Sequence, residues 1–340
     1  MTEPRDPYFD NAKALLVCLV VIGHLNDYWG LEGLSLAGGH FIYTFHMAAF
    51  TFLAGLFSRS FDTSPRRVRA LVADLLIPYV IVEIAITLLR WAISGELVTT
   101  ILEPRFGLWF LVALFSWRLA TPILRLLRWP LPIAIVISLT SGFDVWGGRV
   151  LSMGRILAFL PFFVAGVMLD DARLARLKEV LRRRGWRIAA VCALLLIAAA
   201  CFVWRNRIER PWFEMSPPFA TDQLWLDFAM RPVVLALGAV GGLAFLALAP
   251  ATRCWLTVIG ENSLVVYLVH LPIAYVAQRW APIPEAVTAL PGSYTPLLLA
   301  AVLGVTLTAL LGNRPVANVL RKVISPPPLG RLLLGPTPSA

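Results

Sequence analysis

Two ionisable residues in the first apolar stretch of the chain are spaced for chemistry at the two ends of one helix. The stretch runs from Asp10 to Trp29 and carries Lys13 near its start and His24 near its end. Eleven steps of 100° return to within about 20° of the starting direction, so both side chains project from one helix face, roughly 16 Å apart along the axis. They cannot touch each other, but they can contact the two ends of one long ligand.

Histidine is suited to proton transfer because it titrates near neutral pH. The chain has four: His24, His40, His46 and His270. The spans predicted below place all four on one side of a membrane, with His40 in the loop before the second span. Ionisable groups within a span are costly and mark functional sites, so we predict that His24 and His46 are catalytic. The alternatives are a hydrogen bond between helices for His24, a bond to a backbone carbonyl for His46, and an interfacial anchor for His270.

The composition is that of a membrane protein. Of 340 residues, 59% are hydrophobic and only 15% are charged, whereas a soluble globular chain carries about 25% charged residues. The net charge of +10 does not indicate nucleic-acid binding, because the basic residues lie in short loops without a stripe of interleaved aromatic residues. No metal-site spacing, P-loop, dinucleotide motif or Gly-x-Ser-x-Gly motif occurs, so we expect no bound metal and no permanently bound cofactor.

Apolar runs of spanning length recur along the chain. We predict ten spans, at residues 12–27, 41–57, 71–91, 106–124, 131–146, 156–170, 187–204, 225–249, 255–275 and 294–312. With the N-terminus inside, 19 Lys and Arg residues fall on the cytoplasmic side and eight on the outer side, as the positive-inside rule requires. The predicted fold is an all-α polytopic membrane helical bundle of about ten transmembrane helices, N-in and C-in. We expect one integral membrane domain over residues 1–325 and a disordered, Pro-rich tail over 326–340.

Several other features have more than one interpretation. Arg118, in the inner half of the fourth span, is either a phosphate ligand or the ion-pair partner of a residue such as Asp74. Asn262 is predicted to cap the inner end of the ninth helix. Segment 171–184 is either a short basic helix on the cytoplasmic leaflet or a solvated connector. The outer loop 205–223 is a lid, part of an acceptor site, or an ordered crossover.

A resemblance to a known family begins in the first span. The stretch RDPYFDNAKALLVCLVVIGH resembles the first membrane helix of acyltransferase family 3, the membrane-bound O-acyltransferases that modify bacterial cell-surface sugars. The closest resemblance is to its fucose 4-O-acetylase-like branch. Other segments resemble the family in the same order: FHMAAFTFLAGLF (45–57), LLIPYVI (75–81), LWFLVALF (108–115), LPFFVAGVML (160–169) and IGENSLVVYLVH (259–270). The family signature pairs a basic residue with a histidine ten intervening residues later, and Lys13 and His24 fill these places.

The resemblance implies ten core helices, acyl-CoA (acetyl-CoA) as co-substrate, and a sugar hydroxyl of a glycoconjugate or glycolipid as acceptor. We therefore expect an O-acetyltransferase of the plasma or inner membrane, with His24 as general base. Its partners would be acyl-CoA, the carbohydrate acceptor and the lipid bilayer. Asp10 and Lys13 would help to hold the CoA end, and Arg69 or Arg118 would add to its phosphate site.

A transporter or exporter of a lipid or carbohydrate is the alternative function. Paired broken helices and polar groups near the midplane would favour it, as would an internal repeat, and none of these stands out in the sequence. A scaffolding membrane protein is a third possibility, and the ionisable residues inside the spans argue against it.

Overall fold

The computed structural model describes residues 6–29, 32–97, 101–143, 150–215, 219, 223–326 and 332–333, and these residues form helices without any strand. The helices are α1 (Pro7–Trp29), α2 (Gly33–Ser58), α3 (Pro65–Leu71), η1 (Val72–Leu76), α4 (Ile77–Ser94), η2 (Phe106–Leu108), α5 (Trp109–Leu126), α6 (Pro130–Thr140), η3 (Ser141–Phe143), η4 (Val150–Ser152), α7 (Met153–Val167), α8 (Asp171–Arg182), α9 (Arg184–Val203), α10 (Arg210–Glu214), α11 (Leu224–Leu248), α12 (Trp255–Glu261), α13 (Ser263–Arg279), α14 (Pro282–Thr288), α15 (Thr295–Gly312) and α16 (Arg314–Ile324).

The helices confirm a polytopic membrane bundle. Among the described residues, eight helices are long and apolar enough to cross a bilayer, and nine are if the bent pair α12–α13 counts as one span. The fifth predicted span, 131–146, corresponds to the shorter apolar helix Pro130–Phe143, and residues 144–149 lie outside the described part of the chain. Eight of the ten predicted spans thus coincide with an apolar helix of spanning length, whereas the fifth is a shorter helix and the ninth is the bent pair.

The chain divides into two compact units. Unit 1 comprises Met1–Phe50, Ala172–Phe213 and Ala236–Val319, and unit 2 comprises Thr51–Asp171, Glu214–Leu235 and Leu320–Ala340.

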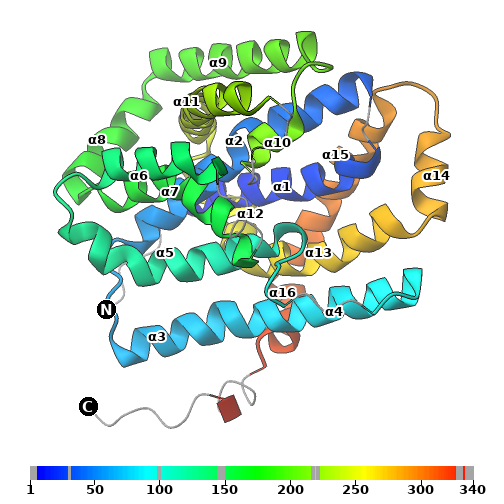
Figure 1. The fold of residues 1–340 in the computed structure, drawn as a ribbon, viewed down its shortest axis with the longest axis horizontal. Helices are drawn as coiled ribbons and strands as arrows, with labels where there is room; N and C mark the ends of the chain where they lie inside the picture. Colours follow the sequence, from blue (N-terminus) through cyan, green and yellow to red (C-terminus); the bar gives the residue numbers. More distant parts are fainter. Residues whose placement is uncertain are drawn as a thin grey trace. The chain divides into compact units, whose positions relative to one another are not determined.

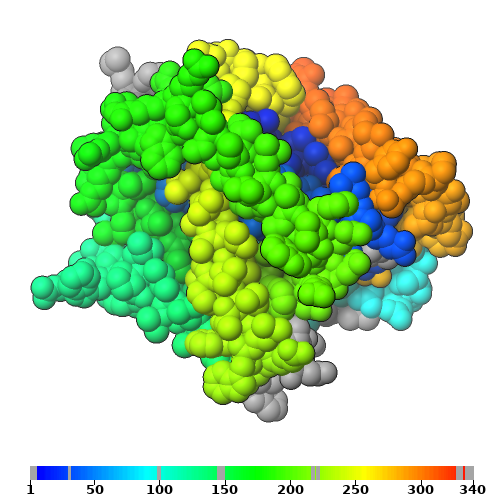
Figure 2. Space-filling view, turned by 90° about the horizontal axis from the view of Figure 1, so that it is seen from above, coloured from blue at the N-terminus to red at the C-terminus, as the bar shows by residue number. Residues whose placement is uncertain are grey.

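In unit 1, α1 is the helix around which the others pack: α12, α13 and α15 all contact it (Figure 1). In the space-filling view, blue atoms of the N-terminal helices show between the green of α9 and the orange of the α14–α15 segment (Figure 2). Glycine permits the closest approach. A Cβ placed on Gly260 of α12 would lie 1.8 Å from the carbonyl oxygen of Asp10, so these two helices meet backbone to backbone.

In unit 2, α3, η1 and α4 continue into one another as a single rod (Figure 1). Helix α7 packs against both α5 and α6. The five residues of η1 form one turn of π-helix, and Pro78 follows it within the first turn of α4. A proline in that position cannot donate a helix hydrogen bond, and a single turn inside a longer helix is the form in which π-helix mostly occurs.

The structure corrects two expectations about individual residues. His40 is not in a loop, because α2 begins at Gly33 and carries His40 as a buried residue of the helix. Asn262 occupies the N-cap position of α13, but its side chain makes no cap bond there. Instead the predicted ninth span breaks at this residue and bends by 75°. Most of the predicted tail 326–340 lies outside the described residues.

Candidate active site

The centre of the candidate site is a pair of histidines from α1 and α13. Nδ1 of His24 lies 2.9 Å from Nε2 of His270, and the two rings stack with their centroids 5.2 Å apart and their planes 20° apart. Nδ1 of His270 lies 3.0 Å from the carbonyl oxygen of Val266, one turn earlier on α13. His270 is fully buried, whereas His24, which it contacts, is half-buried and more accessible to solvent or a ligand.

His46, the other histidine predicted to be catalytic, has different contacts. Its Nδ1 lies 2.7 Å from the carbonyl oxygen of Ile42 on its own helix, and its ring packs edge-on against Tyr43 at 5.1 Å. The carbonyl bond that was the alternative for His46 is therefore present. The histidine that the structure joins to His24 is His270.

A carboxylate on the next turn of α1 anchors the segment that follows α9. Oδ2 of Asp27 accepts a hydrogen bond from the Tyr43 hydroxyl at 2.7 Å and pairs with the Arg210 guanidinium at 2.6 Å. The guanidinium also lies over the Tyr43 ring, 4.8 Å from its centroid, which is a favourable cation–π geometry. His40 donates to the carbonyl of Arg205 at 3.2 Å. The first half of the predicted loop 205–223 is thus fastened to α1 and α2.

At the other end of α1, Lys13 and Asp10 form an ion pair of 2.7 Å. The Asp10 side chain is 5% exposed and that of Lys13 is 23% exposed. Oδ2 of Asp10 is buried without a hydrogen-bond partner. Burying a carboxylate oxygen without a hydrogen-bond partner costs free energy. Through its other oxygen, the buried carboxylate holds the ammonium of Lys13 in a fixed position. The structural alternative for Lys13, a pair with Asp10, is therefore present.

Asn11 fixes the same end of α1 to the start of α12. Its side-chain amide donates to the carbonyls of Pro250 and Thr252 at 2.9 and 2.8 Å. Its Oδ1 accepts from the Thr257 hydroxyl at 2.8 Å and from the Cys254 thiol at 3.5 Å. A fully buried amide with both its donor and its acceptor groups satisfied determines the register of the helix that carries it.

Comparison with known protein families places the chain in one of them. A family model described as an acyltransferase domain matches residues 6–311. The chain belongs to acyltransferase family 3. It is therefore a membrane acyltransferase, and the match covers both Lys13 and His24 as well as the helix that carries His270. No curated protein and no solved structure matches the chain.

Two predicted donor-site residues of this acyltransferase belong to unit 2, so the structure does not join them to Lys13. Arg118 on α5 donates to the Ser58 hydroxyl at 3.4 Å and interacts electrostatically with Asp74. Arg69 lies in α3 and is partly exposed. Both interpretations of Arg118 remain compatible with these contacts, because a guanidinium has five N–H donors.

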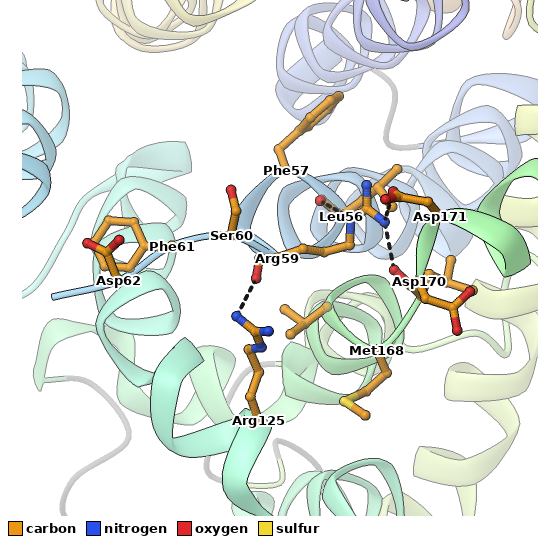
Figure 3. Close-up of a pocket in the computed structure, with 12 residues that line it drawn as sticks. Leu56, Phe57, Arg59, Ser60, Phe61, Asp62, Arg125, Met168, Asp170 and Asp171 are labelled. Atoms are coloured by element: carbon orange, nitrogen blue, oxygen red, sulfur yellow. Dashed lines mark hydrogen bonds and ion pairs between the residues drawn. The ribbon is translucent and has the colours of Figure 1, made fainter. Parts of the chain in front are cut away.

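Unit 2 also contains a pocket of about 770 Å³ where α2, α5 and α7 end (Figure 3). The Arg59 guanidinium crosses it to pair with Asp171 at 2.9 Å and to donate to the carbonyl of Leu169 at 2.8 Å. Arg125 donates to the carbonyl of Arg59 at 3.0 Å. Both arginines of the pocket are thus engaged with the protein itself.

The remaining charge in this pocket is acidic. Hydrogen bonds from the side chain and backbone of Ser64 hold the pKa of the Asp62 carboxyl below its usual range, so it stays ionised at neutral pH. Asp62, Asp170 and Asp171 together outnumber the two arginines. Like charges repel over these distances, so the pocket does not suit a polyphosphate, and we do not assign the donor site to it.

The contacts of the site include residues that sequence analysis left without a role: Asp27, Tyr43, Arg210 and Gln278. Gln278 of α13 donates to the backbone carbonyl of His24. Of these residues only Asp27 carried a usable signal, since it is ionisable and follows His24 by one helical turn. Within the described part of the chain, no group of three or more His, Cys, Asp or Glu side chains is arranged to hold a metal ion.

Proposed function

We propose that this acyltransferase transfers an acyl group, most simply acetyl, from cytoplasmic acyl-CoA to a sugar hydroxyl of a cell-surface or secreted glycoconjugate. In this proposal the protein lies in the plasma or inner membrane with both termini in the cytoplasm, and the acceptor is bound at the outer side. The observation that carries the proposal is that α1 has a positioned cation, Lys13, near one end and a hydrogen-bonded histidine, His24, near the other.

The chemistry follows from the histidine. His24 accepts the proton of the sugar hydroxyl as the oxygen attacks the thioester carbonyl carbon. The tetrahedral intermediate then expels the CoA thiolate, and His24 returns the proton to that sulfur. The net reaction makes one ester bond and breaks one thioester bond, and it needs no acyl-enzyme intermediate. His46 is the second histidine of the proposed site, with Tyr43 packed between it and the Asp27 cluster.

The donor is proposed to lie along α1. Extended pantetheine has a length of the same order as the roughly 16 Å that separate Lys13 from His24 on an ideal helix. Lys13 would contact the CoA phosphates. Asp10 would not contact them itself, because a carboxylate repels phosphate; its role would be to orient Lys13.

The test is acyl transfer by the purified protein in lipid vesicles, with radiolabelled acetyl-CoA and an extract of surface glycoconjugates as acceptor. The His24→Ala variant should insert normally and lose about 10² to 10⁴ in rate, the usual contribution of a general base. His40→Gln is the matched control, since glutamine can still donate to the Arg205 carbonyl and His40 has no proposed role in the reaction. Near-normal transfer by inserted His24→Ala protein would refute the assignment.

A transporter or exporter of a lipid or carbohydrate is the second candidate function. The bent pair α12–α13 favours it, because transporters use broken helices at their binding sites. The same vesicles separate the two functions. A transporter would move labelled lipid or sugar across the bilayer without consuming acetyl-CoA, whereas the enzyme would consume acetyl-CoA in proportion to acceptor modified.

A further inference from the structure

We propose that His270 is a positioning residue: it determines which ring nitrogen of His24 carries the proton and so keeps Nε2 of His24 as the basic atom. This inference rests on the proposed function in one respect only, the use of His24 as a base. The assignment of the tautomers depends on the hydrogen-bond geometry and on both imidazoles being neutral.

The first step concerns His270 itself. Its Nδ1 is 3.0 Å from the carbonyl oxygen of Val266. A carbonyl oxygen only accepts hydrogen bonds, so the proton of this contact must belong to Nδ1. A neutral imidazole has one N–H group, and a proton on Nδ1 therefore leaves a lone pair on Nε2. The backbone of α13 thus makes His270 an acceptor at Nε2.

The second step determines which nitrogen of His24 carries the proton. Nε2 of His270 lies 2.9 Å from Nδ1 of His24. Because the His270 nitrogen accepts, the His24 nitrogen must donate, which places the single proton of neutral His24 on Nδ1. The lone pair of His24 is then on Nε2. The carbonyl of Val266 and the two imidazoles form one directed chain that ends in a base.

The third step is that the chain is rigid. The His270 ring is completely buried, and Tyr267 packs against it with ring centroids 5.9 Å apart. The Gln278 side chain donates to the backbone carbonyl of His24, so α13 holds both the ring and the main chain of that residue. A general base needs both a defined tautomer and a defined direction, and these contacts supply both.

The relation resembles that of the carboxylate and histidine in serine proteases, where the partner orients the imidazole and fixes its tautomer. Here the partner is a neutral histidine instead of an anion. It can select the tautomer and the ring orientation, but it cannot offset the positive charge that His24 acquires during the reaction. We therefore expect His270 to contribute less to the rate than the roughly 10⁴-fold effect of misplacing the proton in a serine protease.

Two substitutions of His270 separate positioning from packing. In His270→Gln the amide oxygen can reach the place of the ring Nε2 and accept from His24, whereas in His270→Asn the shorter side chain reaches only the place of Nδ1. Both remove the ring and leave a polar amide in the same cavity. We expect His270→Gln to keep kcat within about 10-fold of the wild type, and His270→Asn to lose about 10²-fold in kcat with little change in either KM.

The tautomer is measured directly by nitrogen NMR on the full-length protein labelled with ¹⁵N-histidine in lipid vesicles, with the His24 signals assigned from their absence in His24→Gln. In the wild type, Nδ1 of His24 should be the protonated nitrogen and Nε2 the unprotonated one. In His270→Asn the two tautomers of His24 should both be populated. A wild-type spectrum with the proton on Nε2, or equal loss of kcat in the glutamine and asparagine variants, would overturn the inference. If the wild type showed the expected tautomer but transferred no acyl group, the proposed function would fail while the pairing stood.

Discussion

The closest approach in unit 1 provides the sharpest test of how α1 is held. A Cβ on Gly260 would lie 1.8 Å from the oxygen, 2.4 Å from the carbonyl carbon and 2.8 Å from the Cα of Asp10. All three atoms belong to the backbone, so no side chain can rotate away. Gly260→Ala therefore requires α12 and α1 to separate by more than about an ångström, since real contacts of a Cβ below 3.0 Å essentially do not occur.

The magnitude follows from two opposing terms. Overpacking a close contact costs typically 1–3 kcal/mol of folding free energy. We expect the upper end, about 3 kcal/mol, for Gly260→Ala, because both contacting groups are backbone and no side chain can rotate away. Alanine offsets about 1 kcal/mol of this, because it is a better helix former than glycine. The net loss of about 2 kcal/mol corresponds to a fall in Tm of about 3 °C for a chain of 340 residues, because the entropy of unfolding is about 2.1 cal/mol/K per residue. The displaced Asp10 should also raise the KM for acyl-CoA more than the KM for the acceptor.

Thermal unfolding in detergent, followed by tryptophan fluorescence, measures the first effect, and initial rates in vesicles measure the second. Gly185→Ala on α9 is the matched control in the same unit, since nothing lies within 4 Å of its Cβ position. That substitution should leave Tm unchanged or raise it. Wild-type Tm and wild-type KM for acyl-CoA in Gly260→Ala would show that α1 and α12 do not meet as described.

Two further predictions concern the charged pairs of α1. Lys13→Arg keeps a phosphate-binding charge and should retain most of the activity, whereas Lys13→Met should raise the KM for acyl-CoA by about 10-fold, the equivalent of about 1.4 kcal/mol; an unchanged KM together with a lower Tm would make the pair with Asp10 purely structural. Arg210→Gln leaves the mostly buried Asp27 carboxylate without its cation and should cost about 1–3 kcal/mol, between the values of exposed and buried pairs. The double variant with Asp27→Asn should lose less than Arg210→Gln alone, as a double-mutant cycle of thermal unfolding would show, and additive losses would contradict the pairing.

The sequence was informative where one physical property dominates. A run of apolar residues long enough to span a bilayer must form a helix, because every backbone polar group needs a partner there. The spacing of Lys13 and His24 depends only on helix geometry, and α1 carries both residues in one unbroken helix. The start of α2 was less clear: the second span was predicted to begin at residue 41 with His40 in the loop before it, whereas α2 begins at Gly33, and its Ser35 hydroxyl donates to the carbonyl of Ser293. Tertiary packing overrides local propensity at such positions.

The partner of His24 could not be chosen from the sequence for a different reason. The topology placed His46 and His270 at the same side of the membrane, and both were therefore possible neighbours. Which of them meets His24 depends on the rotation of α13 and α2 about their own axes. The rotation of α13 follows from interhelical packing, which no single helix encodes, and the Gln278 bond to the His24 carbonyl of α1 is one of its contacts. On α2, the bond to the Ile42 carbonyl directs the His46 ring along its own helix.

The break at Asn262 connects these observations. The Asn262 amide donates to the carbonyls of Val258 and Gly312, both at 3.0 Å, and so satisfies an acceptor that the interrupted helix would otherwise leave open. The bend of 75° gives the two halves of one predicted span different directions. Helix α12 can then lie against the Asp10 backbone at the start of α1, while α13 carries His270 to His24 near the other end. The two halves of the bent pair therefore contact α1 at Asp10, the ion-pair partner of Lys13, and at His24.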